Sequence, residues 1–221
     1  MKQKDLAKLI DHTLLKPDAS YADIKMLCKE ALQFGFHSVC IYPYYTGIVK
    51  ALLKDSNVRI TTVIGFPSGM TTTDEKVLEA MNAALAGADE LDIVINIGAL
   101  KSKNWHVVTK DISDVIAATK GLIHKVIIET CYLTISEKKK AVGTALGAGA
   151  EFIKTSTGFG PKGAQTRDIR LIKSIVGDKA GIKAAGGIRT LEQVLAMLDA
   201  GASRIGTTAG VKIMKELKVR K

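Results

Sequence analysis

The chain alternates between short apolar segments and longer segments of helical periodicity along its whole length. Short runs of β-branched and apolar residues are typical of buried strands, and an amphipathic helix after each strand is typical of a parallel sheet. Strands are predicted at residues 13–15, 38–42, 59–66, 90–95, 125–129, 152–155, 181–184 and 204–207. Helices are predicted after them at residues 21–33, 45–54, 73–86, 105–119, 136–146, 165–176, 191–199 and 209–217, and one more, at residues 3–10, precedes them all.

These repeated strand and helix units predict an α/β protein that forms a single (β/α)8 TIM barrel with an extra N-terminal helix. The length of 221 residues fits this fold, whose usual length is about 250 residues. Glycine stands near the ends of several predicted helices, at Gly35, Gly87, Gly149 and Gly201, where its left-handed conformation can end a helix. A doubly wound open sheet is the alternative, but it usually has fewer strands and, for dinucleotides, a Gly-x-Gly-x-x-Gly turn that the first strand lacks here. No long linker divides the chain, so we expect residues 1–221 to form one domain.

Composition and charge exclude several classes of protein. With 47% hydrophobic and 24% charged residues the chain is not disordered, and no apolar run is long enough for a membrane helix. The net charge is +10, but there is no long basic block and only 5% of the residues are aromatic, which argues against nucleic acid as a partner. The three cysteines and four histidines show no metal-site spacing. Free thiols, and a polar rather than apolar start of the chain, predict a cytoplasmic protein.

Charged residues inside three predicted core strands are the candidates for catalysis: Asp92, Lys154 and Lys183. Polar groups at the carboxyl ends of barrel strands face the active site. A buried lysine reaches water, pairs with a carboxylate or loses its proton, and a second lysine nearby favours the neutral amine that forms a Schiff base with a carbonyl. Each residue alone could equally be an edge-strand residue or part of a structural ion pair. The three together favour catalysis.

Glycine-rich segments follow the last three predicted strands, at residues 155–160, 186–190 and 206–210. Backbone amides in such loops, ahead of helix N-termini, form the phosphate site of many barrels. The alternative is that glycine only closes tight turns between strand and helix. With the lysines, these loops predict a phosphate-binding barrel that carries an amine nucleophile.

At these residues the chain resembles the deoxyribose-phosphate aldolases, a family of class I aldolases. Residues 152–158 (FIKTSTG) and 182–190 (IKAAGGIRT) resemble the two lysine motifs of the family, residues 90–96 (ELDIVIN) its aspartate strand, and residues 10–15 (IDHTLL) its opening strand. The resemblance extends over nearly the whole chain. It implies reversible cleavage of 2-deoxy-D-ribose 5-phosphate to D-glyceraldehyde 3-phosphate and acetaldehyde, in deoxyribose phosphate catabolism, without a metal ion or cofactor.

The resemblance also implies a role for individual residues. Lys154 is the implied Schiff-base lysine. Lys183 lowers the pKa of Lys154 and shuttles protons, and Asp92 is the general acid/base partner, acting through a water. The implied substrate-binding residues are Asp11, Thr13, Cys40, Thr157, Gly158, Gly186, Gly187, Thr207 and Thr208. Cys40 equally fits a small buried hydrophobe. The expected partners are the phosphorylated deoxy-sugar and acetaldehyde, and a second copy of the chain in a homodimer or higher homo-oligomer, without nucleic acid or membrane.

The chain departs from the family pattern near the implied phosphate site. Thr208 and Ala209 stand where the family often has serines, and Phe159 stands where some members have a basic residue. Lys162 is therefore our hypothesis for the residue that supplies positive charge to the phosphate. Two other functions stay open at this point: a related Schiff-base aldolase acting on another sugar phosphate, and a basic binding protein without catalysis.

Overall fold

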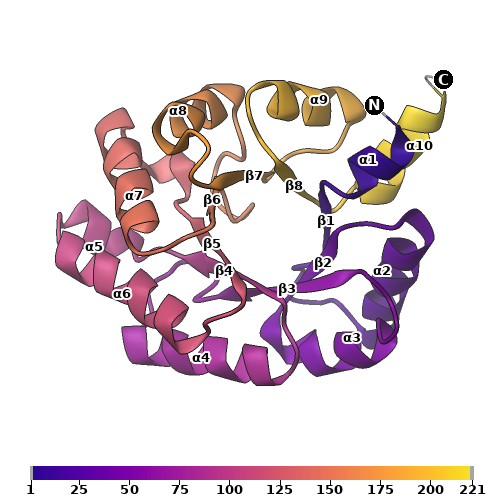
Figure 1. Cartoon of the computed structure of the whole chain (residues 1–221), viewed down its shortest axis with the longest axis horizontal. Helices are drawn as coiled ribbons and strands as arrows, with labels where there is room; N and C mark the ends of the chain where they lie inside the picture. The colour runs from indigo at the N-terminus through magenta and orange to yellow at the C-terminus, as the bar shows by residue number, and fades with distance from the viewer. Residues whose placement is uncertain (1, 220–221) are drawn as a thin grey trace.

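A computed structural model describes residues 2–219 and shows eight parallel strands closed into a barrel in the order β1 to β8. The strands are β1 (Ile10–Thr13), β2 (Ser38–Ile41), β3 (Arg59–Ile64), β4 (Glu90–Val94), β5 (Ile123–Ile127), β6 (Phe152–Lys154), β7 (Gly181–Ala185) and β8 (Arg204–Thr207). The barrel closes where β1 pairs with β8, with Asp11 opposite Gly206. Figure 1 shows the strands at the centre and the helices in a ring around them. The predicted (β/α)8 barrel is confirmed.

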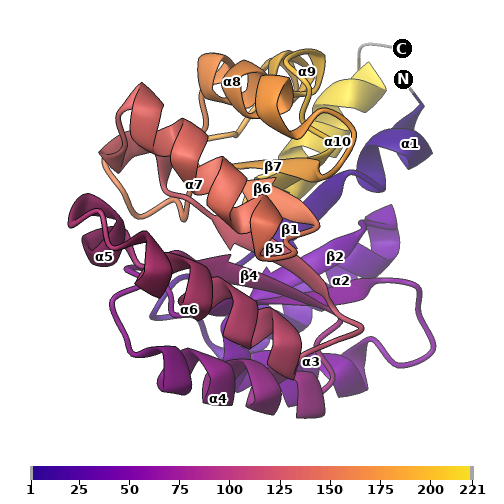
Figure 2. The same ribbon diagram turned by 60° about the vertical axis from the view of Figure 1, so that its left-hand side comes forward.

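The helices of this ring follow the strands in chain order. They are α1 (Gln3–Ala7), α2 (Tyr21–Phe34), α3 (Thr46–Leu52), α4 (Thr73–Leu85), α5 (Ile97–Lys101), α6 (Trp105–Ala118), α7 (Ile135–Gly147), α8 (Thr166–Val176), α9 (Leu191–Asp199) and α10 (Gly210–Val219). The additional N-terminal helix α1 lies beside α10 in Figures 1 and 2, where Gln3 Nε2 donates to Met214 O at 3.2 Å. The short helix α5 was not predicted. Across residues 2–219, no helix has the length and apolar character needed to span a membrane.

Local sequence signals fix where the main helices begin. Four of them start after a serine or threonine whose side-chain oxygen accepts the N–H of the residue three positions later: Ser20, Thr72, Thr134 and Thr190. An acidic or amide side chain at that later position accepts in return from the backbone N–H of the capping residue. These reciprocal bonds satisfy N–H groups that the first helical turn leaves free. The capping residues therefore define where these four helices begin.

The first strand begins earlier than predicted. The prediction placed a helix at residues 3–10 and a strand at residues 13–15, but β1 covers Ile10–Thr13. The polar pair Asp11 and His12 belongs to the strand because both buried side chains find charged partners. The Asp11 carboxylate lies 3.0 Å from Arg204 inside the barrel, and His12 Nε2 lies 2.7 Å from Glu30 outside it.

Alternation along the strands separates two environments. On β4, Leu91 and Ile93 pack outward in a cluster with apolar residues of α4 and α6. The intervening residues Glu90 and Asp92 face inward, where both carboxylates contact Lys125 of β5. Because side chains alternate with a period of two, a strand can bury apolar residues on one face and charged residues on the other. The barrel interior is thus the place where charged groups of different strands meet.

Candidate active site

Asp92 lies inside the barrel with three lysines bound to its carboxylate. Lys125 Nζ is 2.8 Å from Asp92 Oδ1, and the Nζ atoms of Lys154 and Lys183 are each 2.7 Å from Oδ2. Asp92, Lys125 and Lys183 have no exposed surface, and Lys154 is 2% exposed. The strand register brings these side chains together. Asp92 pairs with Lys125 across β4 and β5, and Lys154 pairs with Lys183 across β6 and β7. The three predicted catalytic residues therefore come together in one cluster.

Two further carboxylates and an arginine extend the cluster through the interior. Asp11 Oδ2 is 2.6 Å from Lys183 Nζ, and Glu90 Oε2 is 2.7 Å from Lys125 Nζ. Arg204 bridges them, at 3.0 Å from Asp11 Oδ1 and 3.4 Å from Glu90 Oε2. We call Asp11, Glu90, Asp92, Lys125, Lys154, Lys183 and Arg204 the interior ion network.

Lys125, Glu90 and Arg204 belong to the network but were not predicted as site residues. All three lie in predicted strands, and each is the first residue of its predicted strand, where a charged side chain commonly reaches solvent. A signal was present: Glu90 is two residues from Asp92 and therefore shares its face of the strand. Lys125 carries a similar signal, since it is a charged residue directly before the apolar residues 126–128 of the same predicted strand.

The charges of this network fix the protonation of its most buried members. Burial alone would raise the pKa of Asp92, but Lys125, Lys154 and Lys183 hold it well below its ordinary value. Burial would likewise raise the pKa of Asp11, yet its neighbouring cations, Lys183 first, lower it to about 2. Burial acts to lower the pKa of Lys183, but Asp11 and Asp92 together raise it above its ordinary value. At neutral pH both aspartates are carboxylates and Lys183 is a cation.

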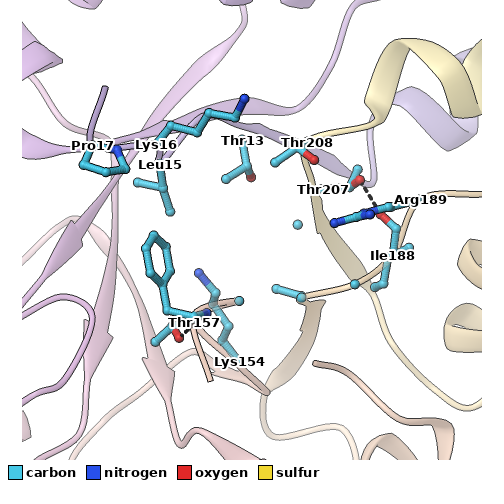
Figure 3. A pocket seen from close by; sticks show the side chains of 16 residues that line it. Thr13, Leu15, Lys16, Pro17, Lys154, Thr157, Ile188, Arg189, Thr207 and Thr208 are labelled. Atoms are coloured by element: carbon cyan, nitrogen blue, oxygen red, sulfur yellow. Dashed lines mark hydrogen bonds between the residues drawn. The ribbon is translucent and has the colours of Figure 1, made fainter. Parts of the chain in front are cut away.

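A cavity of about 300 Å³ opens at the carboxyl ends of the strands, with Lys154 in its wall. Figure 3 shows the Lys154 amine extending into this cavity, with Thr13 and Thr208 on the opposite side. The predicted substrate-binding residues that line it are Thr13, Thr157, Gly158, Gly186, Gly187, Thr207 and Thr208. Asp11 and Cys40 are instead buried in the barrel interior, at 0% and 1% exposure. The structure thus brings seven of the nine implied binding residues to one cavity.

Two cations of the cavity wall were not predicted. Lys16 follows β1 and Arg189 follows β7, and both are exposed side chains that line the cavity (Figure 3). Lys162, which we hypothesised as the phosphate cation, is exposed on the loop after β6 and lies outside the residues that form the cavity wall. Arg189 was part of the quoted segment IKAAGGIRT, so the signal for it was present beside Gly186 and Gly187.

Glycine gives the cavity loops their shape. Gly158, Gly186 and Gly187 have φ values of 91°, 90° and 76°, which side chains disfavour. A Cβ on Gly163 would come 2.1 Å from Gly186 O, so the loops after β6 and β7 lie in close contact. The tight turns weighed in the sequence analysis are therefore present, and they leave exposed backbone at Gly158 and Gly187 beside the cavity.

Two of the threonine hydroxyls are occupied within the loops. Thr207 Oγ1 donates to Ile188 O at 2.6 Å and accepts from Ala209 N at 2.9 Å. Thr157 Oγ1 donates to the carboxylate of Glu129 and accepts from Phe159 N at 3.0 Å. Their hydroxyls hold loop backbone in place, so the groups of the wall that can meet a phosphate are backbone amides, the cations and the Thr208 hydroxyl.

Cys40 lies next to the ion network rather than in the cavity wall. Its Sγ atom is 3.9 Å from Asp92 Oδ2, and burial raises the pKa of the thiol. It also packs in a small apolar cluster with Leu15 and Val63. The structure therefore fits its description as a small buried hydrophobe.

Three side chains in the interior approach the spacing of a metal site. Asp11, His37 and Glu90 each place one possible ligand atom within 4.8 Å of the others. Arg204 already contacts both carboxylates, and His37 Nε2 is 2.8 Å from Glu90 Oε1. These atoms are partners in the ion network, and an added cation would have to displace Arg204.

The fold and this cluster of lysines identify the chain as an aldolase. Residues 6–216 match the family described as DeoC/LacD family aldolase, and the chain belongs to this family. It is 54% identical to the deoxyribose-phosphate aldolase of Dictyoglomus turgidum, over 98% of this chain and 99% of that protein. It is 55% identical to that of Thermococcus gammatolerans, over 96% of both chains. Its structure matches the tetrameric deoxyribose phosphate aldolase of Aeropyrum pernix with a TM-score of 0.93 and 33% identity, covering 100% of this chain and 94% of that one.

The depressed pKa of Asp11 leads to a prediction about stability. The folded carboxyl has a pKa of about 2 and the unfolded one an ordinary value near 3.8, so the folded state binds its proton later as pH falls. This stabilisation, about 2 kcal/mol, is present above about pH 4 and is lost as pH falls toward 2. We expect Asp11→Asn to lower the free energy of unfolding by about 3 kcal/mol at pH 7, because Lys183 and Arg204 lose a buried partner.

Urea unfolding of wild type and Asp11→Asn at pH 7, 4 and 3 measures this difference. The difference in the free energy of unfolding between wild type and Asp11→Asn should become smaller as pH falls. A difference in unfolding free energy that is the same at all three pH values would contradict the ionised state of Asp11.

Proposed function

We propose that the protein is a deoxyribose-phosphate aldolase that reversibly cleaves 2-deoxy-D-ribose 5-phosphate to D-glyceraldehyde 3-phosphate and acetaldehyde. The observation that carries the proposal is the Lys154 amine, which reaches a cavity with two cations in its wall while its Nζ atom contacts the Asp92 carboxylate. The high identity to deoxyribose-phosphate aldolases over nearly the whole chain supports the same substrate.

The charges of the interior ion network favour Lys154 as the nucleophile. The network holds three carboxylates and four cations, so the loss of one proton makes the buried charges equal. Lys125 and Lys183 each contact two carboxylates, whereas Lys154 contacts Asp92 alone. Neutral Lys154 therefore leaves every carboxylate paired. It is also the one of these three lysines that lines the cavity.

In the first step, the neutral Lys154 amine attacks the C1 aldehyde of the open-chain sugar. The carbinolamine takes back the proton that Lys154 had released, loses its hydroxyl as water and becomes a protonated imine. The imine nitrogen is the former Lys154 Nζ, so this cation lies against the Asp92 carboxylate. Asp92 thus stabilises the intermediate electrostatically, and a water held by Asp92 carries protons to and from the reacting atoms.

In the second step, the bond between C2 and C3 breaks. The C3 hydroxyl loses its proton and becomes the aldehyde of glyceraldehyde 3-phosphate, and the bonding electrons flow to the imine nitrogen to give a neutral enamine. This electron flow removes the fourth positive charge from the network, so the surrounding cations favour it. Protonation at C2 and hydrolysis then release acetaldehyde and restore the Lys154 amine. In this scheme the raised pKa of Lys183 makes it a fixed cation that holds Asp92, rather than a group that gives up its proton.

The cavity loops provide the matching site for the phosphate. Arg189 and Lys16 supply positive charge at the wall, and backbone near Gly158 and Gly187 approaches the cavity without side chains. Charged hydrogen bonds of this kind are the usual way in which proteins hold phosphate. The aldehyde end of the sugar then points to Lys154 and its phosphate to the loops after β6 and β7.

Reductive trapping tests the nucleophile. Acetaldehyde and borohydride should leave an ethyl group on Lys154, located by peptide mass mapping, because reduction fixes the imine. The Lys154→Ala variant should give no adduct and lower kcat for cleavage about a thousandfold or more. Lys162→Ala is the matched control and should be trapped on Lys154 as in wild type.

Two outcomes would change this proposal. An adduct on Lys183 would keep the Schiff-base chemistry but exchange the roles of the lysines. Folded wild type without any adduct would contradict the aldolase mechanism.

Substitution of the wall cations tests the phosphate site. Arg189→Ala should raise KM for 2-deoxyribose 5-phosphate about tenfold and leave kcat within about twofold, because a charge-assisted contact to the phosphate is lost. Lys162→Ala should leave both constants unchanged, since its side chain lies outside the cavity wall. Steady-state kinetics measure both variants. A raised KM in Lys162→Ala with an unchanged KM in Arg189→Ala would instead make Lys162 the residue that supplies positive charge to the phosphate.

We also propose that the protein is a homodimer or higher homo-oligomer. The support is the tetrameric relative from Aeropyrum pernix, whose chain this one matches over its whole length. Light scattering coupled to gel filtration should give a mass at least twice the 23.6 kDa of one chain. A mass of one chain at micromolar concentration would contradict this expectation. The cytoplasmic location expected from the free cysteines stays a prediction.

A further inference from the structure

Glu129 is a buried carboxylate with an unusual backbone just after β5. It is 2% exposed, and its φ and ψ angles are 47° and 68°, the left-handed region that residues with a side chain disfavour. None of the ion pairs formed within residues 2–219 involves it. A buried charge without a cation requires hydrogen bonds from elsewhere. Neither the proposed chemistry nor the phosphate site explains this residue.

The hydrogen bonds come from the loop that follows the proposed Schiff-base strand. Glu129 Oε2 accepts from Thr157 N at 3.0 Å and from the Thr157 hydroxyl, and Oε1 lies 3.6 Å from Cys131 Sγ. The Thr157 oxygen accepts in turn from Phe159 N at 3.0 Å. One carboxylate therefore fixes the first turn of the loop after β6.

The left-handed backbone places Glu129 between two hydrogen bonds that hold β6. Ile128 N donates to Lys154 O at 3.1 Å, and Thr130 N donates to Thr155 O at 2.9 Å. The two neighbours of Glu129 thus continue the pairing with β6, while its side chain reaches Thr157 beyond that pairing. The unfavourable backbone conformation of Glu129 is offset locally, because it lets the neighbours of Glu129 bond β6 while its side chain bonds the loop after β6.

Thr157 connects this carboxylate to the cavity. Figure 3 shows Thr157 near Lys154 in the cavity wall, and Gly158, the next residue, lines the same cavity. A Cβ on Gly158 would lie 3.8 Å from the Cα of Gly186, so the two glycine loops face each other closely. Displacement of Thr157 would therefore move Gly158 against Gly186, whereas Lys154 is held on its strand by the sheet and by Asp92.

We propose that Glu129 is a positioning residue for the phosphate end of the substrate. Its carboxylate fixes Thr157 and thereby the backbone at Gly158 that meets a sugar phosphate monoester. Glu129 itself takes no part in the Schiff-base chemistry. This inference rests on the proposed function, because it assigns the loop after β6 to the phosphate of that substrate.

A comparison of two substrates tests the inference. The Glu129→Ala variant should lower kcat/KM for 2-deoxyribose 5-phosphate about tenfold, mainly through KM, and change kcat/KM for 2-deoxyribose by less than about twofold. Trapping of acetaldehyde on Lys154 should be unchanged. Glu129→Gln should recover part of the loss, because its amide oxygen still accepts from Thr157 N–H.

A second variant removes the contact between Glu129 and Thr157 from the side of the loop. Thr157→Val removes the hydroxyl and should reproduce the selective loss for the phosphorylated substrate. The Glu129→Ala/Thr157→Val double variant should lose less than the two single losses combined, because both remove one shared contact. Glu137→Ala is the matched control, since this half-buried carboxylate also follows β5 but pairs with Lys101 and caps α7. It should leave both substrates unaffected.

The outcomes separate this inference from the proposed function. Equal losses for both substrates in a folded Glu129→Ala protein, or no loss for either, would overturn the positioning role while aldolase activity stands. If Glu129→Ala does not fold, Thr157→Val decides by the same comparison of substrates. A wild-type protein that cleaves neither substrate would overturn the proposed function, and this inference with it.

Discussion

The carboxylate of Asp92 is the interaction on which the interior of the barrel depends. TIM-barrel interiors are usually filled with branched apolar side chains, but here three lysines from three strands converge on one carboxylate. Transfer of each ion out of water costs several kcal/mol, which only close and complete pairing offsets. Lys125 and Lys183 each join Asp92 to a second carboxylate, so the pairs form one connected network. The network therefore links the six strands β1, β4, β5, β6, β7 and β8 through their charged side chains.

The same network distinguishes lysines that sequence alone makes equivalent. Lys125 and Lys183 lie between carboxylates and have no exposed surface, whereas Lys154 has one carboxylate partner and reaches the cavity. The network contains one more cation than carboxylates, and the proposed mechanism uses the lysine that has one carboxylate partner and lines the cavity. The reactivity proposed for Lys154 is thus a property of the whole interior rather than of one neighbouring residue.

The alternation of strands and helices was enough to predict the barrel, because each element carries its own periodicity. The error at β1 has a physical cause: Asp11 is tolerated in a strand only through Lys183 and Arg204, which are distant in sequence. Lys125 was missed for a similar reason, since its two carboxylate partners lie on another strand. Local patterns report which face of a strand is buried, but the pairing of charges requires the register between strands. The charges inside core strands already indicated Lys154, Lys183 and Asp92, the resemblance implied their roles, and the structure supplied their partners.

The arrangement also separates the chemistry from the recognition of the substrate. The lysines and Asp92 lie on strands fixed by the sheet ladder, while the cations and glycines that suit a phosphate lie on loops. Loops of this fold can change without disturbing the barrel, so the departures at Thr208 and Ala209 need no compensation within the ion network. They need compensation only within the cavity wall, where Arg189 and Lys16 supply charge. Glu129 joins the two parts, because it follows a barrel strand and yet bonds a loop threonine, and this explains why a buried charge occurs in so unfavourable a backbone conformation.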